Sequence, residues 1–139
     1  MGDTRAAARS WAEAWQAGWE ALDAERILAC YADGAVLSTE PYREPYRGRA
    51  GVRDYVTRVF GEEAEPRVWL SEPIVDGDRA AISWWASLLE DGADATLAGT
   101  SVLRFGEDGL VVEQWDAWNQ LGERRDPPNT WGPFGGRDA

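Results

Sequence analysis

The sequence predicts an α+β fold in which three N-terminal helices pack on one side of a strongly curved antiparallel sheet. Helical periodicity is confined to the first half of the chain, and long runs bounded by Asp-Gly turns fill the second half. Because helices and strands are segregated in this way, the helices are expected to gather on one face of the sheet. With 139 residues, the chain is long enough to bury a core within a single domain.

A first helix is expected from about residue 3 to residue 22. Within it, Trp11, Trp15 and Trp19 repeat at the spacing that places side chains on one helical stripe. Core packing is the simplest interpretation of these indoles. The chain has nine Trp, however, and that number exceeds what a domain of this size needs, so some indole surface is expected to line a cavity or an interface.

Two further helices are expected before the sheet. Asp23 fits the N-cap of a helix over 24–31, and a third helix is expected between Gly51 and Gly61. Cys30, the single cysteine, falls in the second helix and is expected to be an inert, buried thiol.

Short irregular segments connect these elements. Residues 35–39 form a brief β-like run, and two prolines break the following segment, which is expected to be a rim loop over 40–49. The acidic segment 62–65 is expected to be a solvated connection.

Strands then follow in hairpin order, over residues 67–75, 79–89, 95–105 and 110–119.

The last of these strands carries the leading functional candidate, Asp116. Alternation of side chains places on one face Leu110, Val112, Gln114, Asp116 and Trp118. A carboxylate in such company must be paired, hydrogen-bonded or shifted in pKa. The alternative is that Asp116 lies near the strand end and reaches water.

Composition excludes several classes of function. The formal charge of -11 repels phosphate backbones and anionic lipids, so neither nucleic acid nor a membrane is an expected partner. The chain has no His, which removes imidazole bases and the usual zinc ligand sets, so no metal or cofactor is expected. No export signal or membrane-length apolar run is present, and a cytoplasmic protein is expected.

Three segments carry a resemblance to a known superfamily: A-C-Y-A-D-G-A-V, P-Y-R-G-R-A-G-V-R-D-Y and F-G-E-D-G-L-V-V-E-Q-W-D-A-W-N. Over about residues 5–121 the chain resembles the nuclear transport factor 2-like (NTF2-like) superfamily of cone-shaped α+β domains. Within that superfamily it is similar to SnoaL-like polyketide cyclases and ketosteroid isomerases. The resemblance implies a cone domain over residues 1–121 and a Pro- and Gly-rich tail over 122–139.

The E-Q-W-D ending of the last strand is similar to an E-H-W-D ending in SnoaL-like cyclases, which implies that Asp116 is the acid/base and that Gln114 replaces a histidine. The isomerase comparison implies Glu40 as a base, if the alignment shifts by one residue. It aligns Trp15 and Ser101 with the oxyanion-binding pair, and Tyr31 with a tyrosine near the pocket.

The resemblance also assigns the faces of the sheet. Ile82, Trp84, Ala86, Leu88 and Leu103 are expected to point into the cone, together with the polar candidates. An outer face that bears Trp85, Val102 and Trp115 is too apolar for a monomer, so a homodimer through this face is expected.

The first functional hypothesis is a cyclase, isomerase, lyase or hydrolase acting on a small apolar, cyclic or aromatic molecule. The candidate catalytic residues are Asp116 and Glu40, and the candidate substrate-binding residues are Trp15, Tyr31, Tyr55, Trp84, Ser101, Gln114 and Trp118. An epoxide-opening version would pair Asp116 with Glu40 or Glu44, and another version makes Glu40 the base and Asp116 its helper.

The second hypothesis is a non-catalytic ligand-binding or assembly module, in which Arg104 or Arg53 neutralises Asp116. A raised pKa of Asp116 in a dry cavity favours chemistry, and a salt bridge favours structure. The sequence also leaves open whether Trp131 and Phe134 anchor the tail over a pocket mouth or on a neighbouring subunit.

Overall fold

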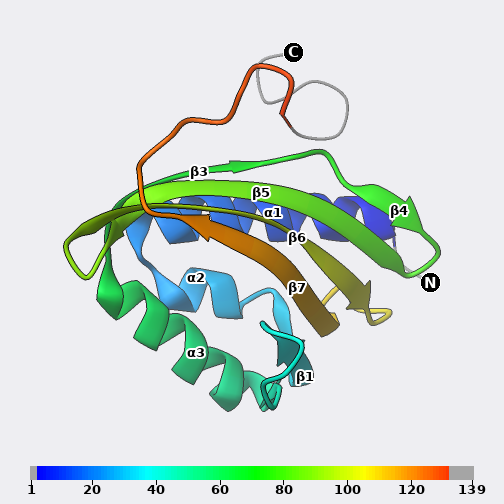
Figure 1. The fold of residues 1–139 in the computed structure, drawn as a ribbon. Coiled ribbons are helices and arrows are strands. Elements are labelled where there is room, and N and C mark those ends of the chain that lie inside the picture. The colour runs from blue at the N-terminus through cyan, green and yellow to red at the C-terminus, as the bar shows by residue number, and fades with distance from the viewer. Residues whose placement is uncertain (1–2, 132–139) are drawn as a thin grey trace.

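The computed structural model describes residues 3–131, which form three helices and a seven-stranded, strongly curved sheet (Figure 1). The helices are α1 (Thr4–Ala21), α2 (Ala24–Leu28) and α3 (Gly48–Glu62). The strands are β1 (Tyr31–Ser38), β2 (Tyr46–Arg47), β3 (Glu63–Leu70), β4 (Ile74–Asp76), β5 (Arg79–Glu90), β6 (Ala93–Phe105) and β7 (Val111–Leu121). The helices lie on the concave side of the sheet, which confirms the predicted α+β cone.

The sheet has the order β2-β1-β7-β6-β5-β3, and β4 pairs with β5 beside that path. The prediction of a wholly antiparallel sheet is wrong at one place, because β1 and β7 are parallel. No hairpin turn joins these two strands, so nothing in the local chain forces them to be antiparallel. The predicted hairpin turn between β5 and β6 is present, and Asp91 and Gly92 have the positive φ values of 49° and 82° that a type I′ turn requires.

Helix α1 protects one edge of the sheet. Asp3 caps the helix by accepting a hydrogen bond from the backbone N–H of Ala6 at 3.1 Å. Further along, Gln16 donates to the carbonyl oxygen of Val68 at 3.1 Å, and Glu20 accepts from the N–H of Val68 at 2.8 Å. These contacts satisfy backbone groups of β3 that would otherwise form an open edge.

The second helix is shorter than the sequence predicts. It ends at Leu28, so Cys30 lies in a turn and Tyr31 is the first residue of β1. The carbonyl of Cys30 accepts a hydrogen bond from the N–H of Val111 at 2.8 Å, which draws the chain into the sheet beside β7. Burial raises the pKa of the Cys30 thiol to about 11, as an inert thiol requires.

Two segments near the third helix also differ from the prediction. The helix begins at Gly48 rather than at Gly51, and its end runs directly into β3. The prediction of a solvated connection over residues 62–65 is wrong for Glu63, which is the first residue of β3, pairs with Glu90 of β5 and is only 7% exposed, whereas the other three residues are exposed.

A β-bulge shifts the register of the last strand. Phe105 pairs with Val111 and Arg104 pairs with Glu113, so β7 carries one extra residue at this point. Val111 is consequently the residue that is fully buried, whereas Leu110 and Val112 are only partly buried. Beyond the bulge the predicted alternation holds, because the Ser101–Asp116 and Leu103–Gln114 pairs lie on the inner face.

The two faces of the central strands are as predicted. On the inner side, Ile82, Trp84, Ala86, Leu88 and Leu103 are all buried. On the outer side, Trp115 remains 54% exposed, and Val102 is partly exposed.

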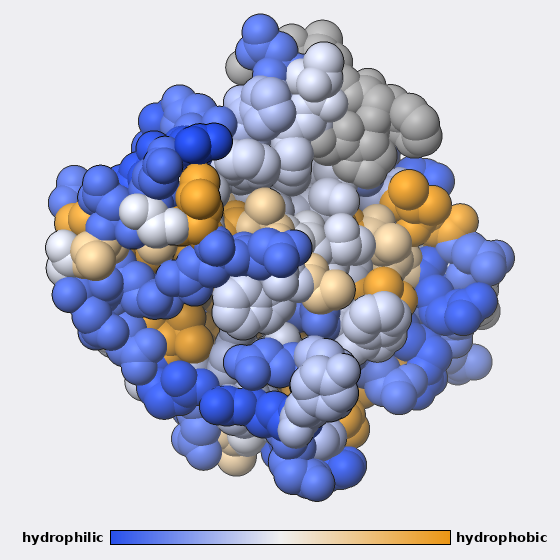
Figure 2. Space-filling view, viewed as in Figure 1, coloured by the Kyte–Doolittle hydropathy of each residue, from blue (hydrophilic) through white to orange (hydrophobic). Residues whose placement is uncertain are grey.

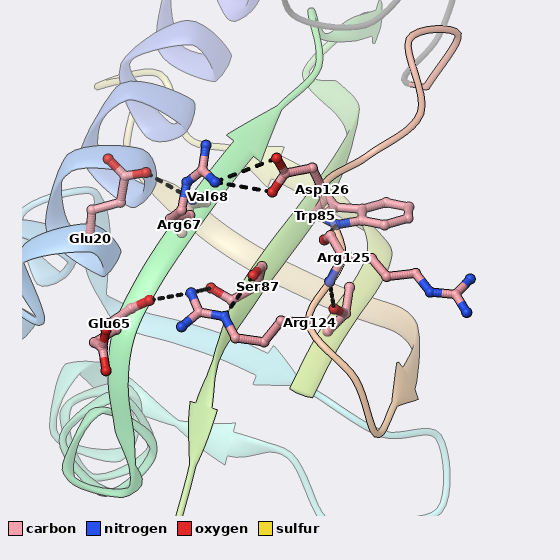
Figure 3. Close-up of polar contacts among 10 residues, drawn as sticks. Glu20, Glu65, Arg67, Val68, Trp85, Ser87, Arg124, Arg125 and Asp126 are labelled. Atoms are coloured by element: carbon pink, nitrogen blue, oxygen red, sulfur yellow. Dashed lines mark hydrogen bonds and ion pairs between the residues drawn. The ribbon is translucent and has the colours of Figure 1, made fainter. Parts of the chain in front are cut away.

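The first part of the tail crosses the outer face of the same sheet (Figures 1 and 3). Arg124 donates to the hydroxyl and the carbonyl oxygen of Ser87, both at 3.0 Å, and to the carbonyl oxygen of Glu65 at 2.6 Å. The indole N–H of Trp85 donates to the carbonyl oxygen of Arg125 at 2.8 Å. This part of the tail therefore covers Trp85 from outside the cone.

Trp131 reinforces that contact, since its ring lies edge-on to the ring of Trp85 with 6.0 Å between the centroids. It thus packs on the outer face of its own chain rather than over a pocket mouth. Phe134 lies outside the described residues, and the division of the chain at residue 121 stays a prediction.

The surface is mostly hydrophilic on the side shown in Figure 2, where residues of intermediate hydropathy gather over the middle. Among residues 3–131, no helix is long and apolar enough to cross a membrane.

Candidate active site

A cavity of about 190 Å³ lies between the helices and the concave face of the sheet. Its wall combines the indoles of α1 with inward residues of β5, β6 and β7 and with one face of α3. Eight of the nine predicted site residues line it, namely Trp15, Glu40, Tyr55, Trp84, Ser101, Gln114, Asp116 and Trp118. The ninth, Tyr31, lies behind the wall and is only 1% exposed.

Asp116 is held in the wall by two neutral donors. Its Oδ1 accepts a hydrogen bond from Ser101 Oγ at 2.6 Å and another from Gln114 Nε2 at 3.0 Å. Within residues 3–131, Oδ2 has no hydrogen-bond partner. The second oxygen of the carboxyl group is therefore available to a bound molecule.

Tyr31 sets the orientation of the Gln114 amide. The phenol oxygen accepts hydrogen bonds from Trp11 Nε1 and Trp15 Nε1, both at 3.1 Å, and its O–H donates to Gln114 Oε1. With its oxygen bound to Tyr31, the amide must present its NH₂ group to Asp116. The indoles of α1 thus act on Asp116 through two intervening side chains.

Trp84 sets the orientation of the Ser101 hydroxyl in the same way. Its indole N–H donates to Ser101 Oγ at 3.0 Å, so the hydroxyl proton is directed to Asp116. Because the orientations of both donors to Oδ1 are fixed by their other hydrogen bonds, the carboxyl group is held in one orientation before any substrate binds.

The electrostatic environment of Asp116 is that of a titrating group rather than of an ion pair. Burial raises its pKa to about 6, and the hydrogen bonds from Ser101 and Gln114 offset part of this effect. The two arginines considered as neutralising partners have other partners: Arg104 pairs with Glu113 at 2.8 Å, and Arg53 pairs with Glu25 at 3.1 Å.

A second buried carboxyl group in the cavity wall, Glu63, was not predicted. Its Oε1 accepts a hydrogen bond from Trp19 Nε1 at 2.7 Å. Burial raises its pKa to about 7, the Trp19 hydrogen bond lowers it, and the carboxylates of Glu90 and Glu62 raise it further. A usable signal did exist, because Glu63 continues the buried stripe of α3 at helical spacing, after Val52, Val56 and Phe60.

Tyr55 is the third polar group of the wall. Its pKa is raised above the usual range of a phenol, first by burial and then by the nearby carboxylates of Asp116 and Glu63. The phenol is therefore neutral at physiological pH and can donate a hydrogen bond to a bound molecule.

The rim of the cavity carries the exposed candidate, Glu40. The neighbouring backbone is fixed by Trp118, whose indole N–H donates to the carbonyl oxygen of Thr39 at 2.8 Å. Arg43 and Arg58 also line the cavity, and both donate to the phenol oxygen of Tyr46 at 2.9 Å. The role of Glu40 as a base stays a prediction, and Glu44 does not line the cavity.

Close packing of two indoles depends on Gly99, which pairs with Trp84 on one side and with Trp118 on the other. A Cβ atom at this position would lie 2.4 Å from the carbonyl oxygen of Ala117 and 2.9 Å from the Trp84 ring. Any larger residue would displace the backbone or an indole of the cavity wall.

Metal ligation is not supported by the described part of the chain. Among residues 3–131, no group of three or more Cys, Asp or Glu side chains is placed to hold a metal ion.

Comparison with known families agrees with this architecture. Residues 8–114 match the family model described as a SnoaL-like domain. The chain belongs to the SnoaL-like family. The range that matches this SnoaL-like domain runs from α1 to Gln114, and Asp116 follows just beyond it. No curated protein matches the chain.

Solved structures share the cone fold of this SnoaL-like domain at low sequence identity. The epoxide hydrolase/cyclase-like enzyme SalBIII, described in pyran ring formation in the polyether salinomycin, superposes with a TM-score of 0.73 and 16% identity. That match covers 86% of this chain and 95% of the other. An NTF2-like protein of unknown function from Exiguobacterium superposes with a TM-score of 0.69 and 15% identity, over 81% of this chain and 98% of its own.

Proposed function

We propose that this SnoaL-like domain is an enzyme that uses Asp116 as an acid/base on a small, apolar, cyclic or aromatic molecule. One observation carries the proposal: Asp116 lines an aromatic cavity with one oxygen free and is held by neutral donors, and among residues 3–131 no cation forms an ion pair with it. A carboxylate that only stabilised the fold would be expected to pair with a guanidinium.

The chemistry follows from the protonation states. With a pKa of about 6, Asp116 is mostly ionised at neutral pH yet is basic enough to accept a proton during a reaction. The neutral phenol of Tyr55 can donate a hydrogen bond to oxygen charge that develops on the substrate. Cyclisation, isomerisation, elimination and hydrolysis all use these two roles, and the similarity to an epoxide hydrolase/cyclase-like enzyme supports this range of reactions.

The first experiment is incubation of the protein in D₂O with a panel of aromatic and polycyclic ketones, followed by mass spectrometry. We expect deuterium to enter carbons next to a carbonyl group in the ketones that bind, because a base at Asp116 exchanges such protons. Crystals soaked with the same ketones are expected to show electron density among the cavity indoles. Density without exchange or turnover would favour a ligand-binding module instead.

We also propose a homodimer through the outer face of the sheet. Trp115 is 54% exposed there, and Leu121 on the same strand is 40% exposed. Light scattering after size exclusion is expected to give a dimer at micromolar concentration, and Trp115→Glu is expected to give a monomer. Tyr42→Glu, in the rim loop away from this face, where the side chain is fully exposed, is the control and should remain dimeric. A monomeric wild type would contradict the proposal.

A further inference from the structure

Glu63 is a buried carboxyl group that no step proposed above uses. It lies in the wall of the cavity, is 7% exposed and has one hydrogen bond, from Trp19 to Oε1. In the part of the chain that the structure describes, Oε2 has no hydrogen-bond partner and the group forms no ion pair. A carboxyl oxygen that has no partner and is accessible in a cavity wall is available to a ligand.

The groups around Glu63 favour its neutral form. Trp19 faces it from α1, Tyr55 and Glu62 face it from α3, and Glu90 faces it from β5. All of these are neutral or negative. Together with burial, the two carboxylates raise the pKa of Glu63 to about 7, so a large fraction is protonated near neutral pH.

Two indoles connect the two acids of the cavity. The rings of Trp19 and Trp84 are 5.8 Å apart, edge to face. The N–H of Trp19 is bound to Glu63, and the N–H of Trp84 is bound to Ser101, which donates to Asp116. The indole pair thus forms an apolar stretch of wall with one carboxyl group beyond each ring.

We infer that Glu63 is a second substrate-binding acid, which donates a hydrogen bond to a carbonyl or ether oxygen of an apolar ring molecule whose other polar group contacts Asp116. The inference rests on the proposed function only in placing the substrate in this cavity. It narrows the substrate class to ring compounds with two separate oxygen functions.

Charge determines which oxygen-containing group of a substrate fits at this end of the cavity. The carboxylates of Glu62 and Glu90 repel an anion, and Arg58, an arginine of the cavity wall, pairs with Glu62 at 3.9 Å. A substrate carboxylate or phosphate is therefore disfavoured at this end of the cavity. A neutral acceptor takes the proton of the Glu63 acid without adding charge.

The test compares two probes that differ in one oxygen and carry an alcohol rather than a phenol, so that neither probe ionises: 4-hydroxy-1-tetralone and 1-hydroxytetralin, which lacks the carbonyl group. Affinities are measured by calorimetry at pH values about two units below and above the pKa of about 7. At the lower pH the ketone is expected to bind about three- to tenfold more tightly, the range typical of one hydrogen bond. At the higher pH this ratio should fall toward one, since ionised Glu63 has no proton to donate.

Variants separate this contact from other effects of pH. Glu63→Gln keeps an N–H donor, so the ketone preference should persist at both pH values. Glu63→Ala should abolish it. Glu65→Gln changes an exposed carboxyl group of the same strand that does not line the cavity, and it should leave the preference and its loss at high pH in place. Titration of Asp116 affects both probes alike and cancels in the ratio.

Equal affinity of wild type for the two probes, or an unchanged ratio in Glu63→Ala, would overturn the inference and leave the role of Asp116 standing. Failure of both probes to bind at all would count against this inference and the proposed function together. Loss of activity in Asp116→Asn is measured separately and does not depend on Glu63.

Discussion

Replacing Asp116 with Asn is expected to lower the turnover of the protein's substrate by about 10²- to 10⁴-fold, the usual contribution of one positioned acid/base. The substitution keeps the shape of the side chain, and its oxygen can still accept from Ser101 and Gln114. What is lost is the free oxygen that takes the proton. Steady-state kinetics on the substrate identified by deuterium exchange gives the measurement.

The matched control is Glu113→Gln on the same strand. Glu113 is exposed, pairs with Arg104 on the outer face and does not line the cavity. Its replacement should change turnover by less than about twofold, because the side chain lies outside the cavity and an exposed ion pair contributes little to stability. Full activity in Asp116→Asn would remove Asp116 from the mechanism, and a large loss in Glu40→Gln instead would make Glu40 the base.

Replacing Asp116 with Asn is also expected to change how activity and stability depend on pH. Activity of the wild type should rise with pH through about 6 as Asp116 ionises, and this limb should be absent in Asp116→Asn. Because folding raises the pKa above the usual value of about 3.9, the stability linked to this group is greatest in acid and is lost as pH rises through about 6. The melting temperature of the variant should therefore equal or exceed that of the wild type above that pH.

Replacing Tyr31 with Phe is expected to destabilise the fold by about 2–4 kcal/mol, because it removes one hydroxyl and leaves several buried polar groups without partners. The indole N–H groups of Trp11 and Trp15 lose their acceptor, and Gln114 loses its donor. For a domain of this size the melting temperature should fall by on the order of 10 °C. Differential scanning calorimetry measures both quantities.

Tyr42→Phe is the control for this prediction, since it makes the same chemical change on a fully exposed side chain. Its free energy of unfolding should match that of the wild type within about 0.5 kcal/mol, the range usual for surface substitutions, and its melting temperature should be nearly unchanged. If the two variants melt together, the hydrogen bonds of Tyr31 do not stabilise the fold. Tyr31→Phe should also lower turnover, because the Gln114 amide is then free to rotate away from Asp116.

Local patterns predicted the inner face of the sheet well. Side chains in a strand alternate with a period of two, so one inward residue places its neighbours. Alternation placed Gln114 on the face of Asp116, and the family resemblance assigned Trp84 and Ser101 to the same interior. Where the period broke, the prediction failed: the bulge in β7 buries Val111 instead of Leu110 and Val112. A bulge depends on how two strands pair, and one strand's sequence does not show it.

Glu63 marks a different limit of the sequence. In a run of acidic residues it has the composition of a solvated segment, and only the continuation of the α3 stripe indicates that it turns inward. Its burial results from Trp19 and from the pairing of β3 with β5, and both partners are distant in the chain. Composition reports the preference of a residue for water, whereas burial depends on what packs against it.

By itself, the sequence determined the α+β class, the Trp stripe of α1, the inward position of Asp116 and the absence of imidazole chemistry, because periodicity and composition are local properties. The tertiary structure alone decided that Tyr31 orients Gln114, that Arg53 and Arg104 pair elsewhere, that Glu63 shares the cavity with Asp116 and that residues 122–131 cover Trp85 on the outer face. Each of these depends on the distance between side chains far apart in the chain, and so does the pKa of a buried acid, which burial and neighbouring groups together determine.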